Sequence, residues 1–196
     1  ALFWMVITIF KWAELSRTIA LGFFDLDDVR AIVGEQLCRV GPDDTLGSLY
    51  FNHLFPMGVA AMTEAVDLVR AETAPRIEQD PSGGSYEGWC TPDDVRIDWH
   101  QDVDQIYNMI RGANPQPGAW TTFAGKRLTV LDSSKSDNTD GDPGAVIAAD
   151  ASGITVAANG GSICISRFKP QGGSKLSAAE MMEQSPLNPG DVLGVD

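Results

Sequence analysis

Few residues of this sequence have the types and spacing that nucleophilic, acid–base or metal chemistry requires. There are two histidines, His53 and His100, and neither stands at a local spacing from a serine and an aspartate that would indicate a catalytic triad. The three cysteines lie far apart and form no Cys-x-x-Cys motif, so we expect reduced thiols and no structural zinc site. We therefore interpret the histidines and cysteines as structural or surface residues, and we expect no bound metal.

Basic residues that could contact phosphate are also scarce. Lys126 and Arg127 are expected at a hairpin tip, and Arg167 and Lys169 flank an apolar residue of a later strand. Strand ends of this kind can contact a nucleic-acid backbone, although solvated charges are the simpler interpretation. The net charge of −13, from 14 basic and 27 acidic residues, argues against broad nucleic-acid contact because such contact depends on basic residues.

The stretch 96–130 has the strongest local signals for secondary structure. Asp102 can cap a helix, with Gln105 three residues later, and apolar residues at helical spacing continue to Ile110. Gly112 is expected to end this helix with a positive φ. Two Pro-containing dipeptides then predict a rigid turn, after which residues 119–122 and 127–130 read as a β-hairpin.

The remainder of the carboxy-terminal half reads as short strands separated by turns. Acidic residues, serines and asparagines dominate residues 133–143, which are expected to form a loop. Ser177 can cap a short helix with Glu180 three residues later. Further strands are expected at residues 128–131, 145–148, 153–158 and 163–168, an arrangement typical of a small barrel.

The amino-terminal half combines apolar runs with a helical region. Residues 1–10 are almost entirely apolar but too short to span a bilayer, so no membrane association is expected. Residues 42–45 can begin a helix, and Pro56 is expected to kink or restart it. Residues 75–88 are rich in proline and glycine and predict a linker between two domains.

Four motifs follow one another within this sequence: Arg96-Ile97-Asp98-Trp99, Ile110-Arg111-Gly112, Asn114-Pro115-Gln116-Pro117-Gly118-Ala119-Trp120 and Gly125-Lys126. In this order they resemble the carboxy-terminal part of the formyltransferase family that uses 10-formyltetrahydrofolate. The resemblance extends from about residue 38 to the end of the chain. The family includes methionyl-tRNA formyltransferase and the hydrolase domain of 10-formyltetrahydrofolate dehydrogenase.

The resemblance implies an α/β fold with two domains. Residues 1–80 would be the second half of a formyltransferase-type α/β catalytic domain, and residues 81–88 a linker. Residues 89–196 would form a barrel similar to the oligonucleotide/oligosaccharide-binding (OB) fold. Residues 19–24 and 32–40 would then be strands on either side of an acidic loop in the catalytic domain.

The same resemblance implies where the chemistry would reside. The family uses an asparagine and a histidine from a loop written roughly N-x-H-P-S-L-L-P, which the 196 residues do not contain, and an aspartate from a later acidic loop. Aligned backward from Cys38, that aspartate would be Asp28, which would relay a proton and orient an attacking water; aligned forward from Trp4, it would be Asp25. Asp25, Leu26 and Asp27 would contact the folate. The alternative interpretation of Asp28 is a solvated loop residue or a helix cap.

We therefore predict an enzyme of one-carbon metabolism that transfers or hydrolyses the formyl group of 10-formyltetrahydrofolate. The expected partner is a folate substrate, and the expected location is the cytoplasm. The acidic charge weighs against tRNA as the acceptor, although a methionyl-tRNA formyltransferase acting in translation initiation stays an alternative. A second alternative is a non-catalytic binding module that retains the barrel, because the asparagine and histidine loop is missing.

Overall fold

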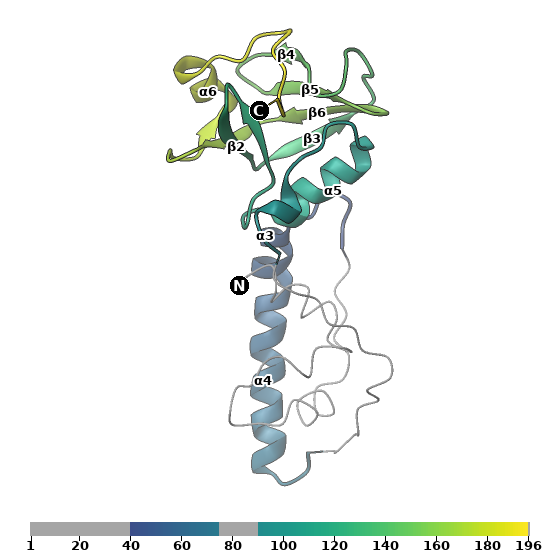
Figure 1. The fold of residues 1–196 in the computed structure, drawn as a ribbon. Helices are drawn as coiled ribbons and strands as arrows, with labels where there is room; N and C mark the ends of the chain where they lie inside the picture. The colour runs from purple at the N-terminus through teal and green to yellow at the C-terminus, as the bar shows by residue number, and fades with distance from the viewer. Residues whose placement is uncertain (1–39, 75–89, 196) are drawn as a thin grey trace. The chain divides into compact units, whose positions relative to one another are not determined.

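The computed structural model describes residues 40–74 and 90–195 (Figure 1). The chain divides into two compact units, Ala1–Trp89 and Cys90–Asp196. The catalytic-domain strands expected at residues 19–24 and 32–40 fall almost entirely outside the described residues. No helix in the described ranges is both long and apolar enough to cross a membrane.

The described part of the first unit is helical. Thr45 caps its start: the Thr45 hydroxyl accepts from the Ser48 amide at 3.0 Å, and the Ser48 hydroxyl accepts from the Thr45 amide at 3.0 Å. Pro56, where a kink or restart was predicted, lies in the first turn of the longest described helix, and the residues before it keep helical backbone angles, so the helix changes type there without ending. The elements are α3 (Leu46–Leu49), a π-helical turn (Tyr50–Leu54) and α4 (Phe55–Arg70).

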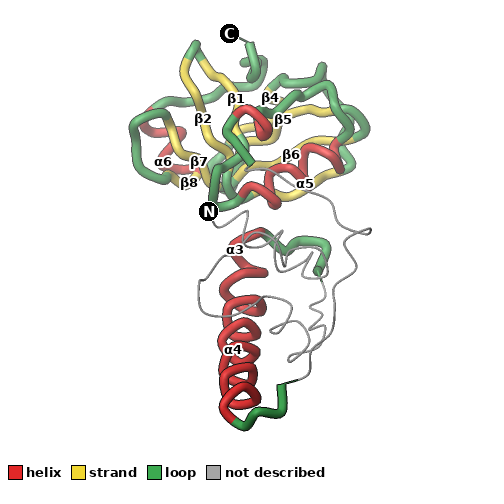
Figure 2. Tube along the Cα trace, turned by 60° about the horizontal axis from the view of Figure 1, so that its bottom comes forward, coloured by secondary structure: helices red, strands yellow, loops and turns green. Residues whose placement is uncertain are grey.

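The described part of the second unit contains two α-helices, a 3-10 helix (Asp93–Val95) and eight strands (Figures 1 and 2). The strands form two antiparallel four-stranded sheets, in the orders β1-β2-β7-β8 and β3-β6-β5-β4. The elements are α5 (Val103–Ala113), β1 (Trp120–Phe123), β2 (Lys126–Val130), β3 (Ser133–Ser136), β4 (Val146–Ala149), β5 (Ile154–Ala158), β6 (Gly161–Ile165), β7 (Arg167–Pro170), β8 (Leu176–Ser177) and α6 (Ala178–Gln184).

The two sheets are joined by one long antiparallel ladder. β2 pairs with β7, placing Val130 opposite Phe168, and β3 pairs with β6, placing Ser133 opposite Ile165. Both pairings follow the same register, so β2–β3 and β6–β7 behave as two long strands that bend together. The core-facing residues change from odd numbers in β6 to the even-numbered Phe168 in β7, which shows that the strands rotate at this bend.

The carboxy-terminal residues connect the two other sheet edges. The Val146 amide of β4 donates to the Asp191 carbonyl at 2.8 Å, and the Gly194 amide donates to the Thr122 carbonyl of β1 at 2.9 Å. The described strands therefore pair as two sheets whose edges are bridged, and not as one closed barrel. They enclose a single core that includes Phe168, and α5 packs on β3 and β6 (Figure 2).

Three local predictions need correction. The helix α5 continues past Gly112 to Ala113, and the positive φ occurs later, at Gly118 (84°). The segment 133–143 is only partly a loop, because its first four residues form β3, whose backbone pairs with β6 despite their polar side chains. The single strand predicted at residues 163–168 is divided between β6 and β7 by the bend.

Candidate functional site

The acidic loop that carries the predicted site lies outside the described residues. Asp28, with its expected catalytic role, and Asp25, Leu26 and Asp27, with their expected folate contacts, all fall within residues 1–39. Their roles stay predictions. The described structure instead shows what the motifs at residues 96–130 do.

The first of these motifs anchors the second unit. Trp99 is 3% exposed, and its indole Nε1 donates to the hydroxyl of Thr121 at 3.0 Å. The Ile97 amide donates to the Trp120 carbonyl at 2.8 Å, which attaches the segment to the edge of β1. A buried tryptophan with its polar atom satisfied contributes a large packing surface. This motif therefore acts in folding.

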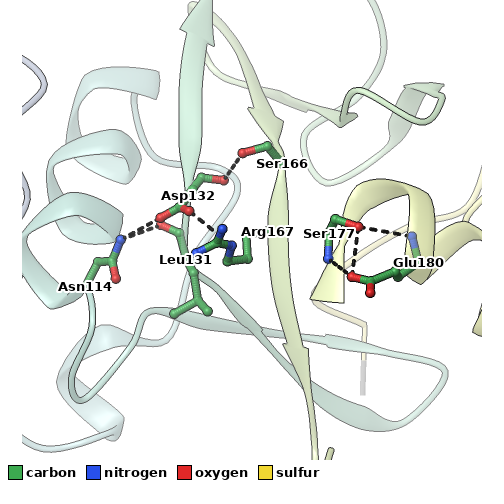
Figure 3. Close-up of polar contacts among 7 residues, drawn as sticks. All are labelled: Asn114, Leu131, Asp132, Ser166, Arg167, Ser177 and Glu180. Atoms are coloured by element: carbon green, nitrogen blue, oxygen red, sulfur yellow. Dashed lines mark hydrogen bonds and ion pairs between the residues drawn. The ribbon is translucent and has the colours of Figure 1, made fainter. Parts of the chain in front are cut away.

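A polar cluster lies at the bend of the long ladder (Figure 3). The Asn114 side-chain amide donates to the Leu131 carbonyl at 3.1 Å and to the Asp132 carboxylate at 3.0 Å. The Arg167 Nε lies 3.4 Å from the other oxygen of this carboxylate. Asn114 thus attaches the turn after α5 to the bend between β2 and β3, and Arg167 of β7 contacts the same carboxylate.

Backbone contacts link the same bend to α6. The Ser166 amide donates to the Asp132 carbonyl at 2.9 Å, and the Ala178 amide donates to the Ser166 carbonyl at 2.9 Å. Figure 3 shows Asn114 and Arg167 turned toward Asp132, with the Asn114 amide nitrogen and the Arg167 Nε each in contact with its carboxylate. The arrangement offers no activated nucleophile and is best described as a brace for the bend.

The predicted cap of the last helix is confirmed. The Ser177 hydroxyl accepts from the Glu180 amide at 3.3 Å, and the Ser177 amide donates to the Glu180 carboxylate at 2.8 Å. The backbone hydrogen bond from Ser177 lowers the pKa of Glu180, assisted by the Ser177 hydroxyl and by the nearby charge of Arg167. Arg167 therefore lies between two acidic groups, Asp132 and Glu180.

The ring of Trp120, on the outer side of β1, contacts the guanidinium groups of two arginines. The Arg127 guanidinium carbon is 4.5 Å from the centroid of the Trp120 ring, and that of Arg96 is 5.4 Å away. The Trp120 Nε1 donates to the Pro92 carbonyl at 2.6 Å, which fixes the ring. The basic hairpin residue Arg127, noted in the sequence, is therefore held against an aromatic surface.

The histidines and Cys90 show no arrangement for nucleophilic catalysis. His100 Nδ1 lies 3.3 Å from the Asp98 carboxylate, but the imidazole side chain is 78% exposed. Partial burial, and then the charge of Asp94, raises the pKa of the Cys90 thiol and so disfavours its reactive thiolate. Within residues 40–74 and 90–195, no three His, Cys, Asp or Glu residues gather as metal ligands.

The comparison with protein families agrees with these motifs. Residues 90–186 match the family described as formyl transferase, C-terminal domain. The second unit is a formyl transferase C-terminal domain. The motifs that suggested the family are thus parts of the domain's core and bend, represented by Trp99 and Asn114.

The relatives of this formyl transferase C-terminal domain include a dehydrogenase and a methionyl-tRNA formyltransferase. The chain is 40% identical over 119 residues to cytosolic 10-formyltetrahydrofolate dehydrogenase of Xenopus laevis, covering 59% of this chain and 13% of the relative. It is 30% identical over 168 residues to methionyl-tRNA formyltransferase of Moorella thermoacetica, covering 85% of this chain and 54% of the relative. The chain therefore spans about half of the second relative and a small part of the first.

A solved structure shares the fold. HypX from Aquifex aeolicus, crystallised in complex with tetrahydrofolic acid, superposes with a TM-score of 0.64 at 17% identity. The likeness covers 81% of this chain and 30% of HypX. This agreement shows a shared fold, while the predicted division at residues 80 and 89 stays a prediction.

Sequence reasoning missed the brace at the bend and the arginine stack. Asn114 was noted only as part of a turn, because its partner Asp132 lies 18 residues later. No local pattern indicates that pairing, since it depends on the bend of β2 into β3. Arg96 and Trp120 are joined by a parallel β-bridge. Sequence patterns for hairpins, which pair antiparallel neighbours, do not predict such a bridge.

Proposed function

We propose that this chain is part of an enzyme that transfers the formyl group of 10-formyltetrahydrofolate to an acceptor or to water. The observation that supports this most directly is the formyl transferase C-terminal domain at residues 90–186. The names of its relatives, a 10-formyltetrahydrofolate dehydrogenase and a methionyl-tRNA formyltransferase, both refer to formyl chemistry. The complex of HypX with tetrahydrofolic acid supports a folate substrate.

The proposed reaction begins when an amine or a water attacks the formyl carbon. The tetrahedral intermediate needs a hydrogen-bond donor for its oxyanion, and protons must leave the nucleophile and reach the folate nitrogen. We assign proton relay to Asp28, with Asp25, Leu26 and Asp27 beside the folate. The oxyanion donor and a histidine would come from the family's N-x-H-P-S-L-L-P loop, which is not among these 196 residues.

A second candidate is methionyl-tRNA formyltransferase. The supporting observation is that the Moorella thermoacetica relative aligns with 85% of this chain. The charge of −13 argues against it, because tRNA carries a dense negative charge. A binding module without catalysis is the third candidate. We also propose the cytoplasm as location, although relatives named cytosolic and mitochondrial both occur.

The test is release of tetrahydrofolate from 10-formyltetrahydrofolate, followed by absorbance. We would compare the 196-residue chain with a chain extended at its amino terminus by a family segment that carries the N-x-H-P-S-L-L-P loop. The 196-residue chain should release tetrahydrofolate at close to the background rate. Loss of an oxyanion donor lowers the rate by about 10²–10³, and loss of a positioned acid–base group lowers it by about 10²–10⁴. The extended chain should be active.

Asp28→Asn in the extended chain supplies the matched comparison. The carboxylate is replaced by an amide of nearly the same shape, so turnover should fall by about 10²–10⁴ while folate binding persists. Unchanged turnover would move the aspartate role to Asp25 or Asp27. A folded extended chain that binds folate without turning it over would instead favour the binding module.

A further inference from the structure

One face of the sheet β1-β2-β7-β8 collects basic residues. The pairing register places Trp120 opposite Thr129 and Thr129 opposite Lys169. Leu128 is buried, so its neighbours Arg127 and Thr129 lie on the other side of the sheet, which is the outer face. Trp120, Thr129 and Lys169 therefore form one row across three strands on this surface, and Arg127 lies on the same face, two residues from Thr129 along β2.

The row continues beyond β7. Phe168 and Leu176 pair with each other and are both buried, which places Lys169 and Lys175 on the opposite, outer side. At the other end, Arg96 forms a bridge with Trp120. We define the basic face as Arg96, Arg127, Lys169 and Lys175 with Trp120, and Lys169 and Lys175 are both exposed.

The basic face has cations available to an outside partner. Arg127 lies on the Trp120 ring, and a guanidinium held in this way keeps its planar N–H edge for a carboxylate. Neighbouring strands are about 4.8 Å apart, so Lys169 stands roughly 5–10 Å from this arginine at the backbone. Within the described part of the chain, Arg127, Lys169 and Lys175 form no ion pair.

The charge of the whole unit limits the length of that partner. From Cys90 to the end there are 8 basic and 14 acidic residues, so a long polyanion would meet repulsion beyond the basic face. Single-stranded nucleic acid also needs aromatic rings on which bases stack. Among residues 90–195 no Phe, Tyr or Trp side chain is in the exposed class, and the Trp120 ring already contacts Arg96 and Arg127. A short anion without bases fits better.

We propose that the basic face binds a short extended acidic peptide segment, whose carboxylates pair with Arg127, Lys169 and Lys175. This goes beyond formyl chemistry and does not depend on it. The charges are complementary, and cations on neighbouring strands of one face are spaced to suit side chains that alternate along an extended chain. The contact would be weak and sensitive to salt, because exposed ion pairs are screened.

The experiment measures fluorescence anisotropy of a labelled penta-glutamate peptide with the whole 196-residue chain at low salt. A penta-glutamine peptide is the uncharged control, and a short unstructured RNA of equal charge is the competing ligand. The glutamate peptide should bind, the glutamine peptide should not, and the RNA should bind no more tightly than the glutamate peptide. Tighter binding of the RNA, or no binding of penta-glutamate, would overturn the proposal.

Variants then locate the site. Lys169→Gln should weaken peptide binding by about two- to fivefold, as expected for one exposed ion pair. Lys135→Gln removes the same charge from the other sheet, where Lys135 pairs with Asp104, and should change the affinity by less than twofold. Arg127→Lys keeps the charge but loses the planar fork, so it should also weaken binding. Equal losses in Lys169→Gln and Lys135→Gln would show a nonspecific charge effect and refute the site.

Discussion

The side-chain amide of Asn114 donates to the Asp132 carboxylate at 3.0 Å, across 18 residues of sequence and at the point where both long strands bend. The same nitrogen donates to the Leu131 carbonyl at 3.1 Å. Arg167 approaches the other side of that carboxylate at 3.4 Å. One side chain thus satisfies both the backbone and the acidic group of the bend, so its removal leaves two partly buried acceptors without this donor.

Asn114→Ala should therefore destabilise the second unit. Loss of hydrogen bonds to partly buried acceptors costs about 1–3 kcal/mol in the free energy of unfolding. Urea unfolding followed by circular dichroism measures this difference. Asn108→Ala is the control, because Asn108 bonds only to the nearby Arg111 on the surface of α5. Equal stabilities of the two variants would show that the brace contributes nothing.

Alanine substitutions at two glycines with positive φ distinguish the cost of backbone strain from the cost of a steric clash. Gly144 has φ 90°, and a Cβ there would lie 2.8 Å from the Leu193 carbonyl oxygen. Gly172 has φ 73° with no atom within 4 Å of the same position. Both alanine variants incur the backbone cost of about 1–2 kcal/mol, but only Gly144→Ala should lose the carboxy-terminal contact as well. A melting temperature for Gly172→Ala at or below that of Gly144→Ala would contradict this.

The cap of α6 should make stability depend on pH. Hydrogen bonds from Ser177 lower the pKa of Glu180 in the folded state. A depressed folded pKa stabilises the fold above the unfolded pKa of about 4.3, and this contribution is lost as pH falls through the folded value. The stability advantage over Glu180→Gln should therefore shrink below about pH 4. Glu183→Gln on the same helix is the control and should show less change.

Loss of the cap itself is a separate test. Ser177→Ala removes the hydroxyl that accepts from the Glu180 amide, and such substitutions cost about 0.5–2 kcal/mol. Ser185→Ala, just beyond the end of α6, is the matched change without an N-cap. Chemical unfolding of both variants at neutral pH compares them, and a smaller loss for Ser177→Ala than for Ser185→Ala would argue against the cap.

The composition of the linker predicts where a protease will cut. Residues 75–88 contain prolines, paired glycines and few apolar residues, so limited proteolysis should cleave there first. The fragment that begins near Gly88 should retain a β-rich circular dichroism spectrum and unfold cooperatively. An unfolded fragment would mean that the second unit does not fold independently, and the domain boundaries predicted at residues 80 and 89 would have to be revised.

Binding to tRNA distinguishes the candidate acceptors. With a net charge of −13, the dissociation constant at physiological salt should be about 1 µM or weaker, and affinity should fall steeply as salt rises. A filter-binding titration at several salt concentrations measures both. Sub-micromolar binding at physiological salt would favour the methionyl-tRNA formyltransferase alternative over the hydrolase.

The sequence predicted the elements whose signals are local. The hairpin turn at residues 124–125 and the capping box at Ser177 appear as expected, because each depends on residues within one or two turns of the chain. Asp102 also caps α5, but its carboxylate accepts from the Asp104 amide and forms no capping box with Gln105. β3 was missed because Ser133, Ser134 and their neighbours are polar, and their place in a sheet comes from pairing with β6. A strand of this kind has no alternation of apolar and polar residues in its sequence that would predict it.

The candidate sites also differ in how far the sequence alone predicts them. The family was recognisable because its motifs are compact and ordered along the chain, and the matched domain at residues 90–186 confirms it. The brace at Asn114 and the basic face around Trp120 depend on contacts between distant strands, so only the fold reveals them. The role of Asp28 rests on resemblance alone and stays a prediction.

The shared register of the long ladder restricts how this domain can change in length. Because β2–β3 and β6–β7 keep one pairing from Leu128–Pro170 through Ser136–Ser162, one residue inserted in either strand would shift every pair beyond it. Buried side chains on that side would turn outward. We therefore expect related sequences to gain or lose residues in the loops at 137–145 and 171–175, and to change length at the bend only by matched insertions in both strands.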